Sequence, residues 1–396
     1  MKFWKKVVLI LFFVFVLAQI PFIYNRYKIG NLSDKIAAMQ TTRTVKPSGY
    51  NDYKGIVHAH TSIGGHSTGT FDELISASNE NELDFVVMTE HTSALYDTSA
   101  MTLRGVHGKT LFVSGNEVST IDDDRFLVIT GDAEIYKGNT TKTADFINKM
   151  HAENKLAFVT YPEKLQSKNA DFDGIEIFSL NTNSKNMNAA LFLFDALWSY
   201  NSYPELLISK YFTRQNDNLA FYDEQTKLRK LTLFAGSDAH SNIGFHLFGD
   251  DANHKIVNLK FDDYATIFRV LRTHVLLVKD KPLTQEHLLT ALKNGNCYAG
   301  FDAMSDTTGF SFSAGDKIQG DEISLQNSVN LTANAPQSAR FVLYRNGEKI
   351  HEQNNANEMN FEAKERGTYR VEVYLDSLES PFNSVPWIIS NPIYVR

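Results

Sequence analysis

The sequence predicts an α/β domain that is preceded by a membrane-spanning helix and followed by a small all-β domain. A long apolar run stands near the amino terminus, and short apolar runs alternate with amphipathic segments from residue 54 to about residue 300. From residue 301 onward the runs are short and alternate apolar with polar residues. Alternating strands and helices are typical of α/β barrels and doubly wound sheets. Closely spaced strands are typical of a β-sandwich.

Length and composition narrow the possible functions. The chain has 396 residues, which favours two or three domains, and a hydrophobic fraction of 43%, which is sufficient for a normal core. Its only cysteine is Cys297, so a disulfide framework and a cysteine-rich zinc module are excluded. The net charge of -7 and the lack of a basic stripe indicate that no nucleic-acid polymer is a partner.

Residues 1–24 carry a membrane signal. Three lysines precede an apolar run from Val7 to Tyr24, which is long enough to cross a bilayer as a helix. The leading lysines place the amino terminus in the cytoplasm, so we expect a single-pass anchor in the cytoplasmic membrane with the body on the extracytoplasmic side. The alternative is a signal peptide that is cleaved before Gln19, which would make the protein secreted. Residues 25–53 are polar and predict a linker with some helical potential.

The region 54–300 predicts alternating buried strands and helices. Apolar runs bounded by turn residues indicate strands, and longer amphipathic segments indicate helices. Thr284 opens the last helix and Gly295 closes it. The predicted strands are 54–58, 85–88, 110–114, 126–129, 156–160, 174–178 and 231–235, and the predicted helices are 71–81, 143–154, 185–200 and 284–293.

The region 301–396 predicts a small β-sandwich. Asn346-Gly347 between two apolar segments is a strong hairpin signal. The predicted strands are 329–333, 339–345, 359–363, 368–375 and 392–396.

Four predicted strands end in residues that bind metal ions. In βα architectures such residues collect at the carboxyl ends of the strands. Residues i and i+2 of a strand project to one face, so the first pair can meet one ion. A purely structural role would require a separate partner for each of these polar side chains. The residues are His58 and His60, Glu90 and His91, Glu117, and Asp238 and His240, with His66 in the loop after the first strand.

The ordered set of these motifs resembles the PHP superfamily, named for polymerase and histidinol phosphatase. The set is His58-x-His60, Thr89-Glu90-His91, Gly115-x-Glu117 and Gly236-Ser237-Asp238-Ala239-His240, and the resemblance covers residues 54–300. It implies a distorted seven-stranded (β/α) barrel with two or three metal ions that hydrolyses phosphoesters. An amino-terminal anchor and a carboxy-terminal β-domain are similar to an exported branch of that superfamily.

The resemblance also implies how the ligands are shared. One ion would be held by His58, His60, Glu117 and Asp238, and a second by His66, His91 and His240, with Glu117 in reach of both.

Two departures from the superfamily pattern concern a third ion. Tyr161-Pro162 stands where many relatives have His-Pro, and the segment 122–125 lacks a histidine that many relatives have there. Together they imply two ions, or a third that is weakly held. Arg125 is our candidate for binding a substrate anion. The alternative is a surface arginine that pairs with neighbouring aspartates.

The expected reaction is hydrolysis by a hydroxide that bridges the metal ions. Glu90, Tyr161 and His246 are candidates for the group that protonates the leaving oxygen or contacts the substrate, although Glu90 could equally orient a histidine. Ligands of this type suit zinc, manganese or iron. We expect a phosphoesterase for a small phosphorylated compound or nucleotide. The alternatives are a carboxylic or carbamate ester hydrolase at the same site, and a metal-stabilised binding protein without activity.

Overall fold

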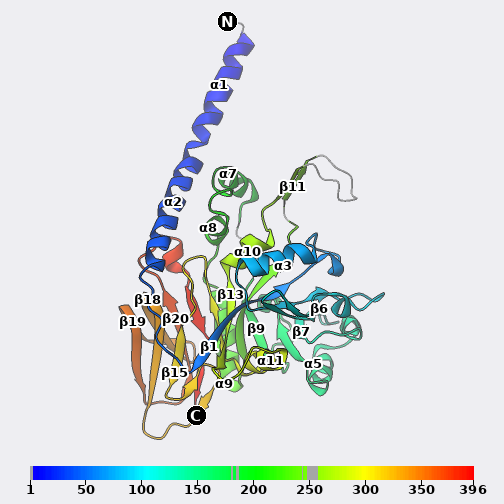
Figure 1. Ribbon diagram of the computed structural model, residues 1–396, viewed down its shortest axis with the longest axis vertical. Coiled ribbons are helices and arrows are strands. Elements are labelled where there is room, and N and C mark those ends of the chain that lie inside the picture. The colour runs from blue at the N-terminus through cyan, green and yellow to red at the C-terminus, as the bar shows by residue number, and fades with distance from the viewer. Residues whose placement is uncertain (1–2, 180–181, 184–186, 243, 248–256) are drawn as a thin grey trace.

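The structure is a computed structural model that describes residues 3–179, 182–183, 187–242, 244–247 and 257–396. A long helical rod projects from a body of packed strands and helices (Figure 1). The prediction of a mixed α/β fold with an amino-terminal apolar helix and a β-rich carboxy-terminal region is confirmed.

All seven strands predicted in the first region form. Apart from the half-buried first half of β1, nearly all of their residues are buried, as expected for apolar runs that are covered on both faces. They are β1 Tyr50–Ala59, β2 Phe85–Met88, β5 Thr110–Val113, β7 Arg125–Ile129, β8 Leu156–Val159, β9 Gly174–Phe178 and β10 Thr232–Ala239.

The pairings of these strands form a ring together with two short strands, β3 Glu90–His91 and β6 Gly115–Ser119. β1 pairs in parallel with β2 and β10, and β9 pairs in parallel with β10 and β8. β7 is antiparallel to both β8 and β6, and β6 is parallel to β3. The ring closes because β3 follows β2 after a single residue. The antiparallel pair β6–β7 departs from regular βα alternation because the turn between them is too short for a helical crossover.

The four predicted helices also form. Thr70 caps α3, Phe71–Glu80, in a reciprocal capping box with Glu73. Thr284 caps α11, Gln285–Asn294, which ends at Gly295 with a φ of 75°. The other two are α5 Thr143–Ala152 and α7 Ala189–Ser199. Among the described residues the sequence did not predict α4 Thr98–Met101, α8 Pro204–Ser209, α9 Asn216–Leu228 and α10 Tyr264–Val270.

The carboxy-terminal region contains a long hairpin. The two predicted strands 329–333 and 339–345 are one strand, β18 Val329–Arg345, interrupted by shifts in register. It pairs with β19 Glu348–Ala363 across the predicted turn, where Asn346 and Gly347 both have positive φ. The remaining strands are β4 Gly105–His107, β11 Gly244–Leu247, β12 Val257–Lys260, β13 Arg272–Val278, β14 Cys297–Gly300, β15 Ser311–Ala314, β16 Lys317–Ile318, β17 Glu322–Ile323, β20 Gly367–Tyr374, β21 Ile388–Ser390 and β22 Ile393–Val395.

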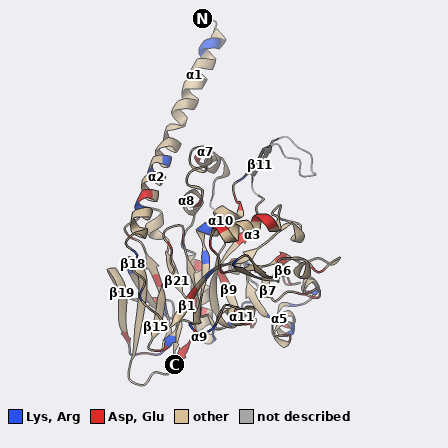
Figure 2. Cartoon of the chain, in the orientation of Figure 1, with Lys and Arg blue, Asp and Glu red and all other residues tan. Residues whose placement is uncertain are grey.

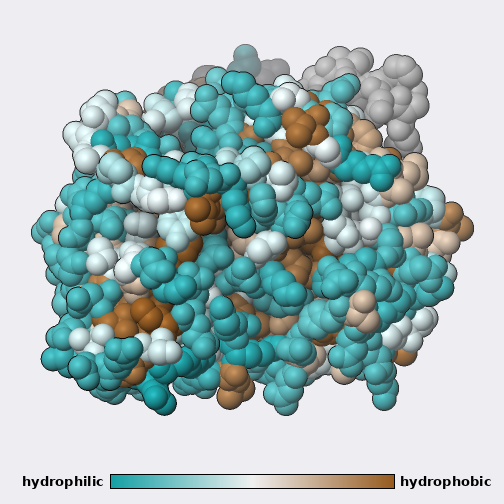
Figure 3. All heavy atoms as spheres, turned by 60° about the horizontal axis from the view of Figure 1, so that its bottom comes forward, coloured by the Kyte–Doolittle hydropathy of each residue, from teal (hydrophilic) through white to brown (hydrophobic). Residues whose placement is uncertain are grey.

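Strand pairing continues from the first region into the second. β14 lies between β13 and β21, and β21 pairs with β20. On the face that Figure 3 presents, hydrophobic residues occur as separate small patches among hydrophilic ones.

The rod consists of α1 Phe3–Ala18 and α2 Ile20–Gln40. Within Phe3–Ala18 no residue is buried, whereas α2 buries Ile29 and Leu32 in the core of the body. The expected linker 25–53 therefore begins as a helix that packs on the body. Between its basic start and α2 the rod carries no charged residue (Figure 2).

A buried histidine at the junction of the two regions predicts a pH-dependent stability. His274 on β13 lies between Asp52, 2.9 Å from its Nδ1, and Asp302, 3.4 Å from its Nε2. Burial alone would lower the pKa of His274, but these two carboxylates raise it from 6.5 to about 10. The charged imidazole therefore contributes stability that is fully present below pH 6.5 and lost as the pH rises through about 10.

We expect the His274→Asn variant to lack this contribution. Urea unfolding from pH 6 to about 10 should show a difference in free energy of unfolding from the wild type that shrinks as the pH rises. A difference that is constant with pH would contradict the charged state of His274.

Candidate metal centre

The strand ends bring the predicted ligands together. One side-chain atom from each of His58, His60, Glu117 and Asp238 lies within 4.8 Å of the others. The nitrogens of His60, His91 and His240 meet the same criterion. His60 belongs to both groups, so the two sets of donors form one continuous cluster.

Glu117 stands where the two groups meet. Its Oε2 lies 3.4 Å from His58 Nε2, 3.3 Å from His60 Nε2 and 3.4 Å from His91 Nδ1. Three imidazoles around one carboxylate oxygen form the kind of donor set that holds a divalent ion.

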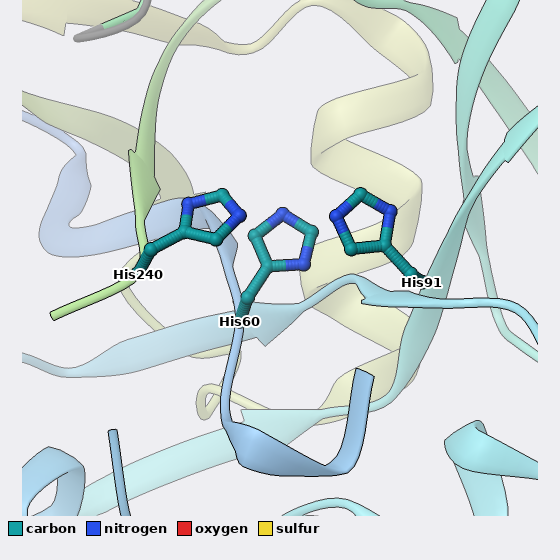
Figure 4. Close-up of side chains that lie close together, drawn as sticks. All are labelled: His60, His91 and His240. Atoms are coloured by element: carbon teal, nitrogen blue, oxygen red, sulfur yellow. The ribbon is translucent and has the colours of Figure 1, made fainter. Parts of the chain in front are cut away.

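The three histidines of the second group lie in a row with His60 in the middle (Figure 4). The ring centroids of His60 and His240 are 4.3 Å apart, and those of His60 and His91 are 4.6 Å apart. His66 is exposed in the loop after β1, and its ring centroid is 4.8 Å from that of His91. His66 thus borders the cluster through His91.

A break in strand geometry positions the first ligands. The register of β1 shifts between Val57 and Ala59 against both neighbouring strands, and His58 has a φ of 72°. His58 and His60 therefore meet through a bulge, and the regular alternation we expected does not apply. Asp238 and Tyr161 also have positive φ, at 48° and 54°. A residue other than glycine is strained at positive φ, and it keeps this conformation only where the surrounding structure holds it. Such residues concentrate at functional sites.

Several buried donor atoms of the cluster lack a hydrogen-bond partner in the described part of the chain. They are both ring nitrogens of His60 and Oδ1 of Asp238. Buried polar atoms are nearly always paired, so several unpaired atoms within one cluster need another explanation. A divalent ion bound by histidine nitrogen and carboxylate oxygen fits these residues.

The protonation states also fit a metal centre. Burial lowers the pKa of His60 to about 3 and that of His91 to about 4, so both rings are neutral and have lone pairs to offer. Burial opposes the charge on Glu117 and Asp238, but His58 holds the pKa of both carboxyls well below their usual range. The cluster thus presents carboxylates and the neutral rings of His60 and His91 at pH 7. Burial opposes the charge on His58, but Glu176 and Asp238 raise its pKa well above the usual value, so His58 must lose a proton to bind an ion.

Glu176 is a residue of the site that the sequence did not single out. Its Oε1 lies 2.6 Å from His58 Nδ1, and its other oxygen accepts a hydrogen bond from the Thr160 hydroxyl. A carboxylate behind a ligating histidine fixes the orientation of the ring. A Cβ at position 236 would lie 1.6 Å from Glu176 Oε1, so only glycine fits there. In the sequence, the signal that could have identified Glu176 is that it is an acidic residue within an otherwise apolar strand, β9.

Tyr161 contacts the cluster through Asp238. Its hydroxyl donates to Asp238 Oδ2 at 2.8 Å, which leaves Asp238 Oδ1 directed at His58 Nε2, 3.2 Å away. Burial and the carboxylate of Asp238 raise the pKa of the Tyr161 phenol, so it stays protonated and acts as a donor.

We expect Tyr161→Phe to weaken metal binding and turnover by about 10- to 100-fold, the usual effect of removing a partner of a ligand. The chain should fold normally because the ring is retained. Metal titration of the purified variant measures the effect. Unchanged affinity and turnover would show that Asp238 needs no such partner.

The carboxylate of Glu90 is held by neighbouring backbone amides and hydroxyl groups. Its carboxylate accepts hydrogen bonds from the Thr61 and Gly64 amides and from the Thr61 and Thr102 hydroxyls, at distances from 2.6 to 3.2 Å. Burial raises its pKa. These contacts fasten the loop that carries His66, which favours the positioning role over that of a proton donor.

A cavity of about 470 Å³ opens over the cluster. Arg125 lines it with Nη1 3.4 Å from Glu117 Oε1, and its side chain is 43% exposed. The neighbouring Asp124 instead accepts hydrogen bonds from Thr143 and from the Gln166 amide. The side chain of His246, on β11, lies outside the described residues.

The floor and the walls of this cavity differ in chemistry. We call the polar lining residues at the cluster the floor: His66, His91, Glu117, Arg125, Tyr161, Asp238 and His240. We call the apolar lining residues the wall: Met187, Phe192, Ile208, Phe212, Phe261 and Ile267. The lining also includes Asn183, Tyr211, Asn242 and Asp262.

Comparison with known proteins gives structural neighbours only. No protein-family model matches the sequence, and no curated protein matches it. One similar structure is a two-domain protein from Bacteroides vulgatus that contains a predicted PHP-like metal-dependent phosphoesterase, with 12% identity and a TM-score of 0.40 over 88% of this chain and 96% of that chain. The lesion-specific endonuclease PfuEndoQ from Pyrococcus furiosus has 13% identity and a TM-score of 0.37 over 61% of this chain and 56% of its own. An Endonuclease Q complex with a 27-mer duplex that carries an abasic lesion has 14% identity and a TM-score of 0.34 over 61% and 57%.

The expectation that no nucleic-acid polymer is a partner is corrected by these neighbours, because two of them are endonucleases and one is bound to a DNA duplex. The expectation relied on the net charge of the whole chain. A metal centre sets its own local field and attracts a phosphodiester whatever the total charge. By its ordered motifs and by the neighbour of that description, the chain is similar to PHP-like metal-dependent phosphoesterases.

Proposed function

We propose that the chain is a metal-dependent phosphoesterase of the PHP type. The observation that carries this is the buried cluster in which His60 and Asp238 present unpaired donor atoms beneath an open cavity. Divalent ions bound there would polarise a scissile ester and activate water at neutral pH. Zinc, manganese and iron all suit such a donor set.

The first proposed ligand set is the first group of donors, and the second takes His91 and His240 from the other group and adds His66, whose ring lies beside His91. His58, His60, Glu117 and Asp238 hold one ion, and His66, His91 and His240 hold the second. Two ions are proposed, because Tyr161 occupies the place of a further histidine and is engaged with Asp238. The closed ring of strands in residues 54–300 corresponds in this proposal to the distorted seven-stranded barrel, with residues 301–396 as the β-domain.

The proposed substrate is a phosphoester whose phosphate reaches the polar floor. A cavity of about 470 Å³ is the size of a small-molecule site. A small phosphorylated compound or a nucleotide fits this volume, and so does the end of a larger molecule. Tyr161 stays protonated and keeps Asp238 in orientation, while Arg125 faces the cavity with a partly exposed guanidinium.

The role of Arg125 leads to a prediction. Arg125→Ala should raise the Michaelis constant for anionic substrates by about 10- to 100-fold with little change in turnover number, because a charge-assisted hydrogen bond contributes roughly 1.5–3 kcal/mol. Arg125→Lys keeps the positive charge but loses the forked guanidinium. Its Michaelis constant should therefore lie between those of the wild type and the alanine variant. Steady-state kinetics with an aryl phosphate give the answer, and an unchanged Michaelis constant in the alanine variant would refute the role.

We also propose that α1 is an uncleaved anchor in the cytoplasmic membrane, with the body on the extracytoplasmic side. The 38-residue helix Phe3–Gln40 is long and apolar enough to cross a bilayer or to act as a signal sequence. Mass spectrometry of the mature amino terminus tests the proposal, since a start at Gln19 would exclude the anchor.

The proposed function is tested with the full chain in detergent. Bound metal is measured by elemental analysis, and turnover is assayed on phosphomonoesters, phosphodiesters, an oligonucleotide and carboxylic and carbamate esters, with Asp238→Asn as the inactive control. We expect about two metals per chain, turnover of a phosphoester and loss of both in the control. Turnover of carboxylic or carbamate esters alone would replace the proposed chemistry. A chain that binds no metal and turns over nothing would be a binding protein.

A further inference from the structure

The exposed face of α7 is entirely apolar. Leu191 is 53% exposed, Leu197 70% and Trp198 38%, and the other exposed residues of the helix are alanines. Its one charged residue, Asp195, is buried and pairs with Lys210 at 2.9 Å. A single exposed leucine is ordinary on a soluble protein, but a whole apolar helix face marks a surface that something covers.

The same helix packs against the amino-terminal rod. The rings of Phe22 and Phe194 stack with centroids 5.3 Å apart, and Asn25 donates to Asp195 at 3.0 Å. Trp198 donates its indole N–H to Gln19 at 3.1 Å. α7 and α8 lie at the end of the body from which α1 projects (Figure 1). The α7 helix therefore stands beside the last turns of the apolar run.

These contacts lie at the position along the rod where the surface of the bilayer is expected. The run ends at Tyr24, and at 1.5 Å per residue Gln19 lies about 8 Å further into the membrane. Amphipathic helices that lie in the interface are buried by about 5–10 Å. Tryptophan is enriched at this depth because its ring is apolar and its N–H needs a partner, and Trp198 has that partner in Gln19.

The α7 helix also forms part of the cavity wall. Phe192 lines the cavity from α7, and Ile208 lines it from α8. A cavity that joins this apolar wall to a floor of metal-binding and cationic groups is complementary to a molecule with a phosphate head and a hydrocarbon tail.

We propose that the substrate is a phosphoester lipid of the membrane in which α1 is anchored, and that α7 lies in the interface and borders its path to the metal centre. This rests on the proposed phosphoesterase function and on the anchor. The head group would reach the floor near Arg125 and Tyr161, while the chains would lie against the apolar wall that includes Phe192.

The position of α7 is tested by fluorescence in the full chain. Of the three tryptophans, Trp387 is fully buried and Trp4 stands at the other end of the rod. In a Trp4→Phe variant reconstituted in phosphatidylcholine bilayers, brominated acyl chains should quench Trp198 strongly, and further replacement Trp198→Phe should remove the quenched component. Quenching no greater than in that second variant would overturn the interfacial position.

The substrate class is tested by kinetics in the same bilayers. We compare phosphatidic acid and phosphatidylglycerol in the bilayer with a short-chain phosphatidic acid, an aryl phosphate and an oligonucleotide in solution. Bilayer lipid should be turned over best. Leu191→Ser combined with Leu197→Ser should lower lipid turnover by about tenfold or more, since two side chains lose their burial in the interface, without changing turnover of the aryl phosphate.

The matched control is Leu228→Ser, because Leu228 is 78% exposed at the end of α9. It should leave lipid turnover unchanged. Turnover of the aryl phosphate with no preference for bilayer lipid, or with preference for the oligonucleotide, would overturn the lipid proposal and leave the phosphoesterase function intact. Failure of every phosphoester would instead sink the proposed function itself.

Discussion

Replacing Glu117 with glutamine is expected to lower turnover by about a thousandfold or more, because metal ions contribute several kcal/mol to the transition state and each 1.36 kcal/mol is a factor of ten. Glu117 Oε2 is within 3.4 Å of nitrogens from His58, His60 and His91, so its charge serves both groups of donors. Glutamine keeps the shape and removes the charge. Bound metal should fall together with activity.

The measurement combines elemental analysis with single-substrate kinetics on the full chain. Glu134→Gln is the control, because Glu134 is exposed and forms an ion pair with Lys137 on the surface. It should match the wild type in both metal content and turnover. A Glu117→Gln variant that retains full metal and activity would show that the cluster is not the reaction centre.

Replacing Arg370 with methionine is expected to lower the free energy of unfolding by about 3–5 kcal/mol, the usual effect of breaking a buried ion pair. Arg370 on β20 binds Asp223 of α9 through two hydrogen bonds of 2.6 and 2.7 Å and also contacts Glu372 at 2.5 Å. All three side chains are less than a tenth exposed. Methionine would leave the buried carboxylate of Asp223 without its arginine, while Glu372 would keep its contacts with Arg214 and Tyr374.

Arg340→Met is a closely matched control. Arg340 also binds one aspartate, Asp376, through two contacts of 2.8 and 3.0 Å, and its guanidinium lies 4.3 Å from the Tyr374 ring centroid. For Arg370 the nearest ring is that of Tyr344 at 4.4 Å. The Asp376 side chain is 45% exposed, so this pair should contribute no more than about 1 kcal/mol. The free energy of unfolding of both variants is measured in detergent. Equal losses in the two variants would refute burial of the ion pair as the cause of the larger effect at Arg370.

The contact between Arg370 and Asp223 also concerns the role of the carboxy-terminal region. It joins β20 to α9, and β14 joins β13 to β21 by backbone hydrogen bonds. Elements connected through a buried charge network and a continuous sheet are expected to unfold together. We therefore expect the carboxy-terminal region to stabilise the part of the chain that carries the candidate metal centre.

The sequence by itself predicted seven strands and four helices of the first region and a set of candidate ligand residues, but it did not predict α4, α8, α9 or α10. Apolar runs located the seven strands, because a strand buried on both faces leaves a continuous hydrophobic signature. Capping residues such as Thr284 and Gly295 located helix ends, and Asn346-Gly347 located the hairpin. The polar residues at four strand ends predicted a shared site, since strand ends of such a fold meet at one edge.

Only the tertiary structure decided how those residues are held. The bulge at His58 depends on pairing with two other strands, and the ring of His58 is oriented by Glu176, which lies 118 positions away. Tyr161 meets Asp238 across 77 positions, and α7 meets the rod across about 170. The local pattern of apolar and polar residues in the sequence indicates which side chains are apolar and where a strand ends. It does not report which distant partner will share a buried space, because that is set by the packing of the whole chain.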